Sequence, residues 1–372
     1  MSGVVTSALS DWPVVARFEI RRRTYLSADG KPLAPLPEFA LDRHELVSLY
    51  RGMLLIRVLD HKAVALQRTG RLGTYAVALG EEATLVGVAS AMRPDDVLFP
   101  TYRDNGALMW RGVSPEEILT YWGGDERGST FAGSPGDFPI SIPVGSHATH
   151  AAGAAYAFKL RRESRAAVCL IGDGATSKGD VYEAMNFAAI HELPVVFVIA
   201  NNGWAISVPG RLQSATVTLA QKAIAAGIEA CQVDGNDVIA VRVTVAEALA
   251  RAVAGGGPGC IEALTYRLGD HTTADDARRY RPDDEVQSHW KGEPIARMRN
   301  FLVARSAWTK EEEERLLAEC RARVETAAET YLALAPRAPA AMFDHTYQEP
   351  PAALLRQRRQ AEEAEHGGDH AR

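Results

Sequence analysis

Apolar runs alternate with amphipathic runs through the middle of the chain, between about residues 140 and 268. Four short, largely apolar runs are typical of buried strands: 166–171, 194–200, 229–233 and 260–267. Three runs with apolar residues at helical spacing separate them: 181–192, 217–227 and 244–256. This alternation predicts an α/β fold, with a mostly parallel sheet and crossover helices that flank it.

Helix-start signals mark the segments on either side of this alternation. A helix is predicted from about 42 to 69, because Asp42 is a suitable N-cap ahead of leucines at helical spacing. Another helix is predicted to start after Ser114, with Pro115 at its first position. A long charged helix is predicted to open at Thr309. In both of these last two segments a glutamate stands three residues after the cap, which completes a capping box.

The distribution of Pro and charge predicts three parts. Residues 1–40 are irregular and punctuated by Pro, which indicates an N-terminal arm. Residues 41–345 hold the α/β domain and a C-terminal helical segment. Residues 346–372 are polar and are expected to form a flexible tail.

Composition and charge exclude several classes of protein. Hydrophobic residues make up 47% of the 372 residues, the share of an ordinary globular protein. The net charge of −6 and pI near 6.0 argue against a nucleic-acid-binding protein. No apolar run is long enough to span a bilayer, and the N-terminus does not resemble a secretory signal, so a cytoplasmic location is expected. Four cysteines are widely spaced and are expected to stay reduced: Cys169, Cys231, Cys260 and Cys320.

The stretch Gly172-Asp173-Gly174 follows directly after the first predicted strand. Ligands bind at the carboxyl edge of parallel sheets, and two glycines let a backbone approach a phosphate closely. Ser177 stands where a dinucleotide fingerprint would need its third glycine, and the chain contains no P-loop motif. The stretch is therefore either a polar turn or a diphosphate site of another kind.

The next predicted strand ends in Asn201-Asn202, and Asn202 lies 202 − 173 = 29 positions after Asp173. One crossover of that length brings a carboxylate and an amide oxygen to the same edge of the sheet. Mg²⁺ prefers such oxygen ligands together with phosphate oxygens. The pair therefore favours a metal–diphosphate site over two unrelated turns.

These stretches, together with others along the chain, resemble a known family. The G-D-G and N-N stretches resemble the thiamine-diphosphate motif of transketolases, decarboxylases and 2-oxo acid dehydrogenases. Longer stretches are similar to the α subunit of the E1 component of 2-oxo acid dehydrogenases, the branched-chain type most of all: "QRTGRLGTYAVALGEEAT", "TYRDNGALMWRG", "GDGATSKGDVYEAMNFAA", "NNGWAISVP", "VDGNDVIAV" and "IEALTYRLGDHTTADDARRYR". The resemblance covers roughly residues 40–355 and implies the thiamine-diphosphate-binding fold.

The resemblance implies a role for nine residues. It implies Mg²⁺ ligands at Asp173, Asn202 and the backbone carbonyl of Trp204. It implies cofactor-binding positions at Tyr102, Arg103, Val144, Gly174 and Ala175. It implies an active-site histidine at His271, in a loop rich in Thr, Asp and Arg.

A potassium site is also implied by the branched-chain relatives, in the segment around residue 144. Ser141, Pro143 and Ser146 could supply ligands, but His147 stands in place of a glutamine, which leaves this site open.

The implied activity is decarboxylation of a 2-oxo acid, with transfer of the acyl unit to the lipoyl group of an E2 acyltransferase. Branched-chain acids are favoured, with pyruvate or acetoin as alternatives within the family. A silent α-like scaffold and a phosphatase built on Asp173 remain alternatives of other classes.

The chain has one strand series, so a second module should come from a β subunit in an α₂β₂ tetramer. Glu81 and Glu82 are expected at that interface. The surface near Tyr102 and the loop 270–281 are expected to be apolar or disordered in the isolated chain.

Overall fold

The computed structural model describes residues 12–368, and a six-stranded sheet lies at the centre of this part of the chain. Its strand order is β1-β7-β8-β4-β3-β2, and every neighbouring pair is parallel. The strands are β1 (Arg22–Arg23), β2 (Val97–Phe99), β3 (Ala167–Gly172), β4 (Val195–Asn201), β7 (Glu229–Asp234) and β8 (Gly259–Leu264). A separate two-stranded antiparallel ribbon pairs β5 (Trp204–Ala205) with β6 (Val208–Pro209). The predicted parallel sheet is confirmed.

Alternate residues of the central strands face two separate hydrophobic cores. In β3, Val168 and Leu170 belong to one core, whereas Cys169 and Ile171 belong to the other. Because both faces are buried, these strands are apolar throughout instead of alternating with polar residues. This burial explains why the strands were visible in the sequence as continuous apolar runs.

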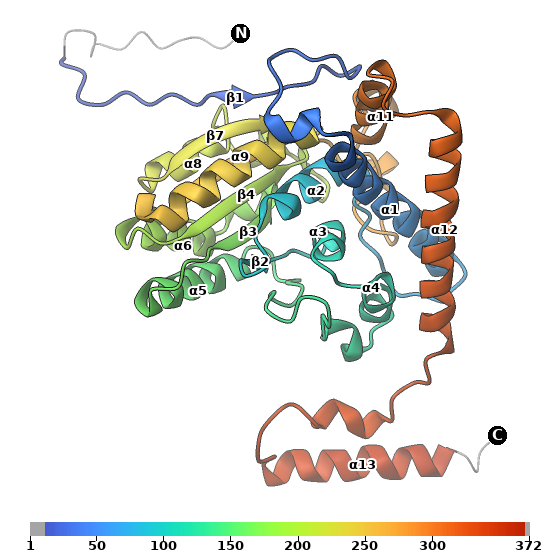
Figure 1. Ribbon diagram of the computed structural model, residues 1–372. Helices are drawn as coiled ribbons and strands as arrows, with labels where there is room; N and C mark the ends of the chain where they lie inside the picture. The colour runs from blue at the N-terminus through green and yellow to red at the C-terminus, as the bar shows by residue number, and fades with distance from the viewer. Residues whose placement is uncertain (1–11, 369–372) are drawn as a thin grey trace.

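Helices cover both faces of the sheet (Figure 1). One face packs against α5 (His147–Arg161), α6 (Gly179–Ile190) and α8 (Ala220–Ala225). The other packs against α2 (Glu82–Ala91) and α9 (Val238–Arg251). These elements form three layers, and the layer of α2 and α9 is covered further by α1 (Arg43–Arg68) and α11 (Pro294–Ala304).

The predicted helix starts are found where the capping residues stand. Asp42 accepts a hydrogen bond from the backbone N–H of His44 at the start of α1. Ser114 caps α4 (Pro115–Trp122), and Thr309 caps α12 (Lys310–Ala333), each with a complete capping box. Capping satisfies N–H groups that a helix leaves without intrahelical partners.

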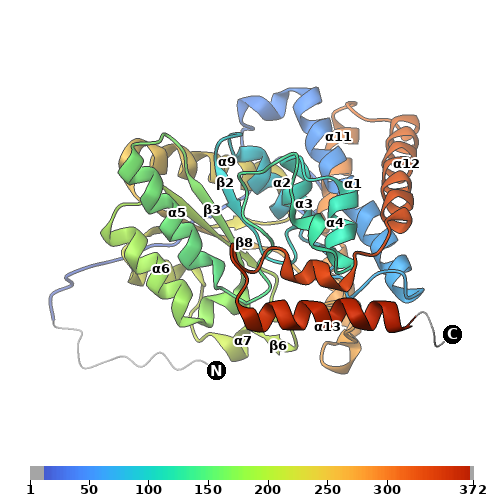
Figure 2. The same cartoon turned by 90° about the horizontal axis from the view of Figure 1, so that it is seen from below.

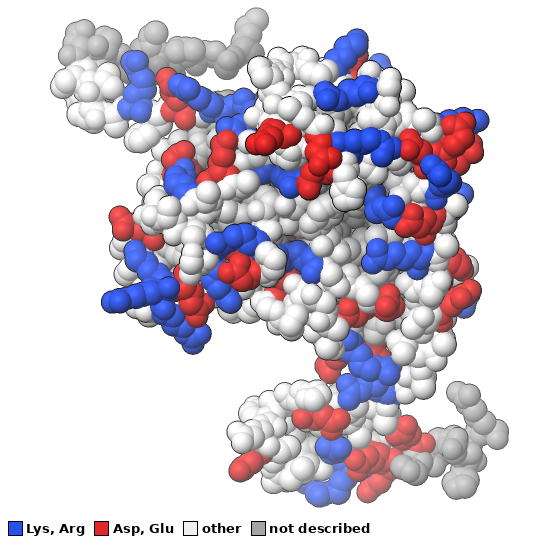
Figure 3. All heavy atoms as spheres, in the orientation of Figure 1, with Lys and Arg blue, Asp and Glu red and all other residues white. Residues whose placement is uncertain are grey.

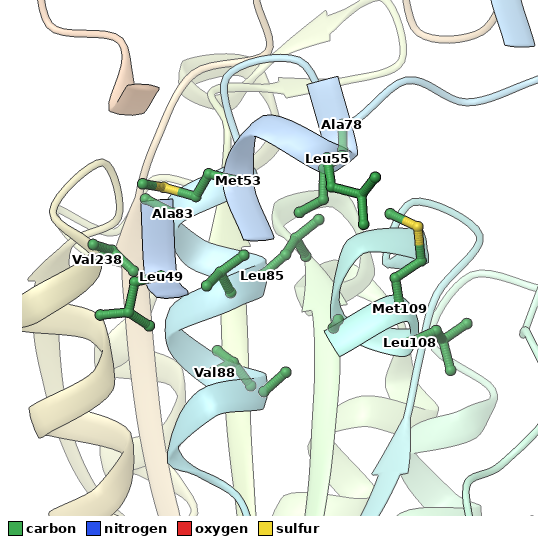
Figure 4. Close-up of a cluster of buried hydrophobic side chains, with 14 of the residues drawn as sticks. Leu49, Met53, Leu55, Ala78, Ala83, Leu85, Val88, Leu108, Met109 and Val238 are labelled. Carbon is green, nitrogen blue, oxygen red and sulfur yellow. The ribbon is translucent and has the colours of Figure 1, made fainter. Parts of the chain in front are cut away.

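Helices α1, α2, α3 (Asn105–Trp110) and α9 meet in the larger core, part of which is drawn in Figure 4. Leu49 and Met53 of α1 lie in this core with Leu85 and Val88 of α2. This packing fixes the start of α2 beside the carboxyl edge of the sheet. The shorter elements are η1 (Glu38–Leu41), η2 (Glu126–Ser129), η3 (Asp173–Ser177), α7 (Gly210–Gln213), η4 (Ala252–Gly256), η5 (Ala277–Arg279), α10 (Asp283–Trp290) and η6 (Pro339–Phe343).

The two ends of the described chain depart from the sequence-based picture. The arm contributes β1, which adds a parallel edge strand next to β7; no strand was predicted there. The tail that we expected to be flexible contains α13 (Ala352–Gly368), which stands away from the body in Figure 1 and packs on η6. Figure 2 shows the same layers from below. Residues 1–11 and 369–372 of the predicted arm and tail lie outside the described residues.

Charged side chains of both signs share the surface, and three of the four cysteines are buried. Acidic and basic side chains are intermixed on the face shown in Figure 3, without a broad basic surface. Cys169, Cys260 and Cys320 are buried, Cys231 is half-buried, and all four are unpaired. Between residues 12 and 368, no helix has the length and apolar character that a membrane crossing requires.

Candidate functional site

A pocket of about 230 Å³ opens at the carboxyl edge of the sheet. The ends of four strands supply its wall, because Tyr102 follows β2, Asp173 follows β3, Asn202 follows β4 and His271 lies in the loop after β8. All nine residues for which the resemblance implied a role line this one pocket. These nine residues lie as much as 169 positions apart in the sequence (271 − 102 = 169).

Asp173 carries a buried oxygen without a partner. The residue is only 4% exposed, and Oδ1 accepts a hydrogen bond from the backbone N–H of Gly174 over 2.9 Å. Oδ2 is fully buried and has no hydrogen-bond partner. Burial raises the pKa of Asp173 to about 6, against the opposing effect of that hydrogen bond. Burying a carboxylate oxygen without a partner costs free energy, unless a cation or a hydrogen-bond donor binds to it.

Asn202 is held by partners on both sides of its amide. Its Nδ2 donates to Oε1 of Glu81 over 2.8 Å, and its Oδ1 accepts from the backbone N–H of Trp204 over 3.1 Å. This pattern assigns the amide oxygen and nitrogen without ambiguity. Gly203, between Asn202 and Trp204, has φ +83°, a left-handed conformation that lets the chain turn sharply here. The same turn therefore presents an amide oxygen and the Trp204 backbone to one pocket.

Glu81 is a functional candidate that sequence reasoning placed wrongly. We expected Glu81 and Glu82 at a subunit interface, but their exposed fractions are 2% and 0%. The Nε of Arg103 lies 3.7 Å from Oε1 of Glu81, which also lines the pocket. Burial raises the pKa of Glu81 to about 7. Glu82 instead forms an ion pair with Arg57 and accepts from the backbone N–H of Gly80, as a structural anchor of α2.

Two guanidinium groups face the imidazole of His271. Nη2 of Arg103 lies 3.1 Å from Nδ1 of His271, and Nη1 of Arg267 lies 3.4 Å from the same nitrogen. Arginine has only donors, so Nδ1 accepts and the proton of the neutral ring lies on Nε2. Burial, followed by Arg103 and Arg267, lowers the pKa of His271 to about 4. The ring is therefore neutral near pH 7, with one N–H available to a ligand.

Arg267 was not singled out from the sequence. Its exposed fraction is 0%, and it donates to the carbonyl oxygen of Ile206 over 2.8 Å and to the hydroxyl of Tyr280 over 2.9 Å. The residue follows β8 and ties the turn after β4 to the loop that carries His271. A signal was present in the sequence, because this arginine ends the largely apolar run 260–267, but nothing local showed where its side chain goes.

The remaining cofactor candidates form the floor and rim of the pocket. At Gly174 a Cβ atom would lie 3.0 Å from the Cβ of Ala205, so this backbone approaches its neighbours closely. Ala175 is buried, Tyr102 is half-buried, and Val144 is 44% exposed at the rim. The 3-10 turn η3 separates Asp173 from the helix predicted over 181–192, which begins as α6 at Gly179.

The segment considered for potassium forms one closed turn. The hydroxyl of Ser146 donates to the carbonyl oxygen of Pro143 over 3.0 Å, and the hydroxyls of Ser141 and Ser146 lie 3.2 Å apart. His147 is buried, and its Nε2 donates to the carbonyl oxygen of Leu170 over 2.6 Å. His147 thus presents no oxygen to this turn. Among the side chains that the structure describes, no three or more of His, Cys, Asp or Glu gather as metal ligands.

Exposed apolar side chains occur in two segments that line the pocket, and Val144 and Ile206 are part of its wall. They come from the turn before α5 and from the segment after β4: Ile142, Val144, Ile206, Val208 and Leu212. The loop 270–281 is rich in charged residues and is ordered, whereas we expected it to be apolar or disordered. Asp275 closes this loop, because its Oδ2 accepts from the backbone N–H of His271 over 2.9 Å and from the hydroxyl of Tyr280.

Comparison with known proteins gives one consistent result. A family model described as dehydrogenase E1 component matches residues 50–337. Pyruvate dehydrogenase E1 component subunit alpha of Mycoplasma genitalium is 38% identical over 330 residues, which cover 89% of this chain and 92% of that protein. 3-Methyl-2-oxobutanoate dehydrogenase subunit alpha of Mycobacterium tuberculosis is 45% identical over 273 residues, 73% and 74% of the two chains. Pyruvate dehydrogenase E1 component subunit alpha of Staphylococcus aureus is 41% identical over 288 residues, 77% and 78% of the two chains.

Proposed function

Since the chain belongs to the dehydrogenase E1 component family as the α subunit of a 2-oxo acid dehydrogenase, we propose that it decarboxylates a branched-chain 2-oxo acid with thiamine diphosphate and Mg²⁺. The family consists of oxidoreductases that use thiamine diphosphate. The observation that carries the proposal is the buried, partnerless Oδ2 of Asp173 in a pocket shared with Asn202 and His271. This arrangement argues against a silent scaffold, in which a carboxylate oxygen would be buried without purpose.

The metal would be held by three oxygen donors of this chain. The candidates are Oδ2 of Asp173, Oδ1 of Asn202 and the backbone carbonyl of Trp204, and all are hard ligands of the kind that Mg²⁺ prefers. One carboxylate supplies only one negative charge against the two positive charges of Mg²⁺. The oxygens of a diphosphate, which Mg²⁺ commonly binds, would supply the rest. The raised pKa of Asp173 fits this assignment, because a bound cation would restore the ionised form.

The diphosphate would lie against the backbone of Gly174 and Ala175, with Tyr102 and Arg103 opposite. Arg103 is 6% exposed, so its charge acts in a site that excludes most water. A guanidinium is suited to phosphate oxygens by its fixed, planar set of donors. Val144 at the rim would contact an apolar part of the cofactor.

When bound, thiamine diphosphate supplies the nucleophile and the electron sink for decarboxylation. His271 would keep its proton at Nε2 and direct this N–H as a hydrogen-bond donor to an oxygen of the bound substrate or of the acyl unit that passes to the lipoyl group of an E2 acyltransferase. Arg103 and Arg267 keep this tautomer by occupying Nδ1. The potassium site remains a hypothesis of lower rank, because His147 offers no oxygen to the turn at Ser141 and Ser146.

The second module would come from a β subunit. The exposed apolar side chains at the pocket mouth support this part of the proposal, because such residues commonly mark a surface that a partner covers. An α₂β₂ tetramer would close the pocket between the two kinds of subunit.

Pyruvate is the second candidate substrate, because two of the similar proteins are named pyruvate dehydrogenase subunits. The deciding experiment assays the chain, co-purified with its β subunit, on pyruvate and on the three branched-chain 2-oxo acids. We expect the highest kcat/KM for a branched-chain acid. A higher value for pyruvate would reassign the substrate, and no decarboxylation of any 2-oxo acid would overturn the function.

A further inference from the structure

A line of side-chain hydrogen bonds runs from the N-terminal arm toward the turn that carries Asn202. Nε and Nη2 of exposed Arg22 donate to Oε1 of Gln232 over 3.2 and 3.1 Å. Nε2 of Gln232 donates to Oε2 of Glu262 over 3.0 Å, and Nδ2 of Asn201 donates to Oε1 of the same carboxylate over 2.7 Å. These four residues lie on β1, β7, β8 and β4, which are consecutive neighbours in the sheet.

Glu262 is the centre of this line and accepts from three directions. It is 1% exposed, and the backbone N–H of Ala220, at the start of α8, donates to Oε2 over 3.0 Å. Three N–H groups therefore donate to the two oxygens of Glu262. An ionised carboxylate can accept all three bonds because it has acceptors only. A glutamine at this position would turn an NH₂ group toward another donor and leave that donor without a partner.

The carboxylate decides how the amide of Asn201 is oriented. With Nδ2 directed at Glu262, Oδ1 of Asn201 accepts from the backbone N–H of Gly203 over 3.2 Å. This side-chain-to-backbone bond closes the turn at Gly203, where φ is +83°. The turn carries Asn202 and Trp204, two of the three proposed metal ligands.

We propose that Glu262 is a positioning residue for this metal-binding turn, and that Arg22 of the arm anchors Glu262 through Gln232. The inference rests on the proposed function, because it assigns the turn to metal binding. Arg22, Gln232, Glu262 and Asn201 all lie outside the pocket wall, so they act only through the turn.

The test exchanges donor and acceptor across the Glu262–Asn201 bond. Glu262→Gln alone sets two NH₂ groups against each other, and Asn201→Asp alone sets two carboxylates against each other. The double variant restores every bond, because Gln donates to the new Asp, whose second oxygen still accepts from Gly203. Glu229→Gln, at an exposed position of β7, is the matched control.

Two readouts are measured on the full chain co-purified with its β subunit. The first is the Mg²⁺ concentration that half-saturates thiamine-diphosphate binding. We expect each single variant to raise it about tenfold, the lower end of what outer-shell partners of metal ligands contribute. The second is hydrogen exchange of the backbone amides in 201–207 without cofactor, which should become faster in each single variant.

The double variant and Glu229→Gln should behave as the wild type in both readouts. Arg22→Ala should also raise the half-saturating Mg²⁺ concentration and speed the amide exchange, but by less than Glu262→Gln does. Should Glu262→Gln fail to fold, Asn201→Asp and the double variant carry the same comparison.

Wild-type binding of the cofactor with unchanged Mg²⁺ dependence in both single variants would overturn the positioning role and leave the proposed function standing. A wild type that binds no thiamine diphosphate would overturn the proposed function and the metal-binding role of the turn together. An unaltered Arg22→Ala variant would remove the arm from the proposal.

Discussion

Nη2 of Arg103 lies 3.1 Å from Nδ1 of His271 and donates to the carbonyl oxygen of the same histidine over 3.0 Å, although 168 positions separate the two residues. Arg103 follows β2, whereas His271 lies in the loop after β8. The contact fixes both the orientation of the imidazole and the nitrogen that carries its proton. It also places a permanent positive charge beside the ring, and this charge disfavours protonation of the imidazole.

The pH dependence of stability should reveal this contact. In the folded chain the pKa of His271 is lowered to about 4 from an ordinary value near 6.5. Between these values the unfolded chain binds the proton and the folded chain does not, so the contribution of His271 is complete above about pH 6.5 and is lost as pH falls toward 4. Urea unfolding of the wild type and His271→Asn from pH 4 to 7 measures the difference. The wild type should lose more stability on acidification, and parallel curves would contradict the lowered pKa.

Asp173→Ala should abolish Mg²⁺-dependent binding of thiamine diphosphate without unfolding the chain. The side chain has one buried, partnerless oxygen, so its loss removes a proposed metal ligand and no structural hydrogen bond except that to Gly174. Calorimetric titration with cofactor and Mg²⁺ measures affinity, and circular dichroism measures folding. Asp180→Asn, at the start of α6, is the control and should bind normally. Unchanged affinity in Asp173→Ala would show that the metal lies elsewhere.

His271→Ala should leave cofactor affinity within about tenfold while lowering reductive acylation of the lipoyl group by about 10²-fold or more, the usual effect of losing an acid–base group. The physical reason is that His271 would act on the substrate through Nε2, whereas the proposed metal ligands lie after β3 and β4. Stopped-flow acylation of an isolated lipoyl domain separates this step from cofactor binding. Acyl transfer at the wild-type rate would remove His271 from the mechanism.

Glu81→Ala should weaken Mg²⁺-dependent cofactor binding about tenfold, as expected for the loss of a group that orients a metal ligand. The substitution leaves Nδ2 of Asn202 without its acceptor and Arg103 without its nearest carboxylate. Glu82→Gln is the matched control, because Glu82 pairs with Arg57 away from the pocket and should affect stability more than affinity. Titration of Mg²⁺ at fixed thiamine diphosphate measures the cofactor affinity of each variant. Equal affinities for the two variants would contradict the role of Glu81.

The isolated chain should decarboxylate 2-oxo acids far more slowly than the chain co-purified with a β subunit. The described residues contain one parallel sheet, and apolar side chains such as Ile206 and Leu212 are exposed beside the pocket. Mass measurement should give an α₂β₂ tetramer for the co-purified sample. A lone chain with the activity of the complex would show that the pocket needs no second module.

The amino-acid sequence by itself determined the parallel sheet and the two strand ends with Asp173 and Asn202. Both faces of the central strands are buried, so the strands read as continuous apolar runs, and the polar residues that follow such runs stand out. Adjacent parallel strands then bring those residues to one edge, which is a consequence of local order alone. The helix starts at Ser114 and Thr309 were predictable for the same reason, because capping depends on residues three positions apart.

Only the tertiary structure decided the roles of Glu81, Glu262 and Arg267. Each is a charged residue whose partners come from distant segments: Glu81 meets Asn202 across 121 positions, and Glu262 meets Asn201 across 61. A buried charge is stable only where donors or opposite charges converge on it, and no local pattern encodes that convergence. From the sequence, we expected both Glu81 and Glu82 at a subunit interface. In the folded chain Glu81 is the N-cap of α2 and its side chain meets Asn202 at the pocket, whereas Glu82, the first residue of α2, pairs with Arg57.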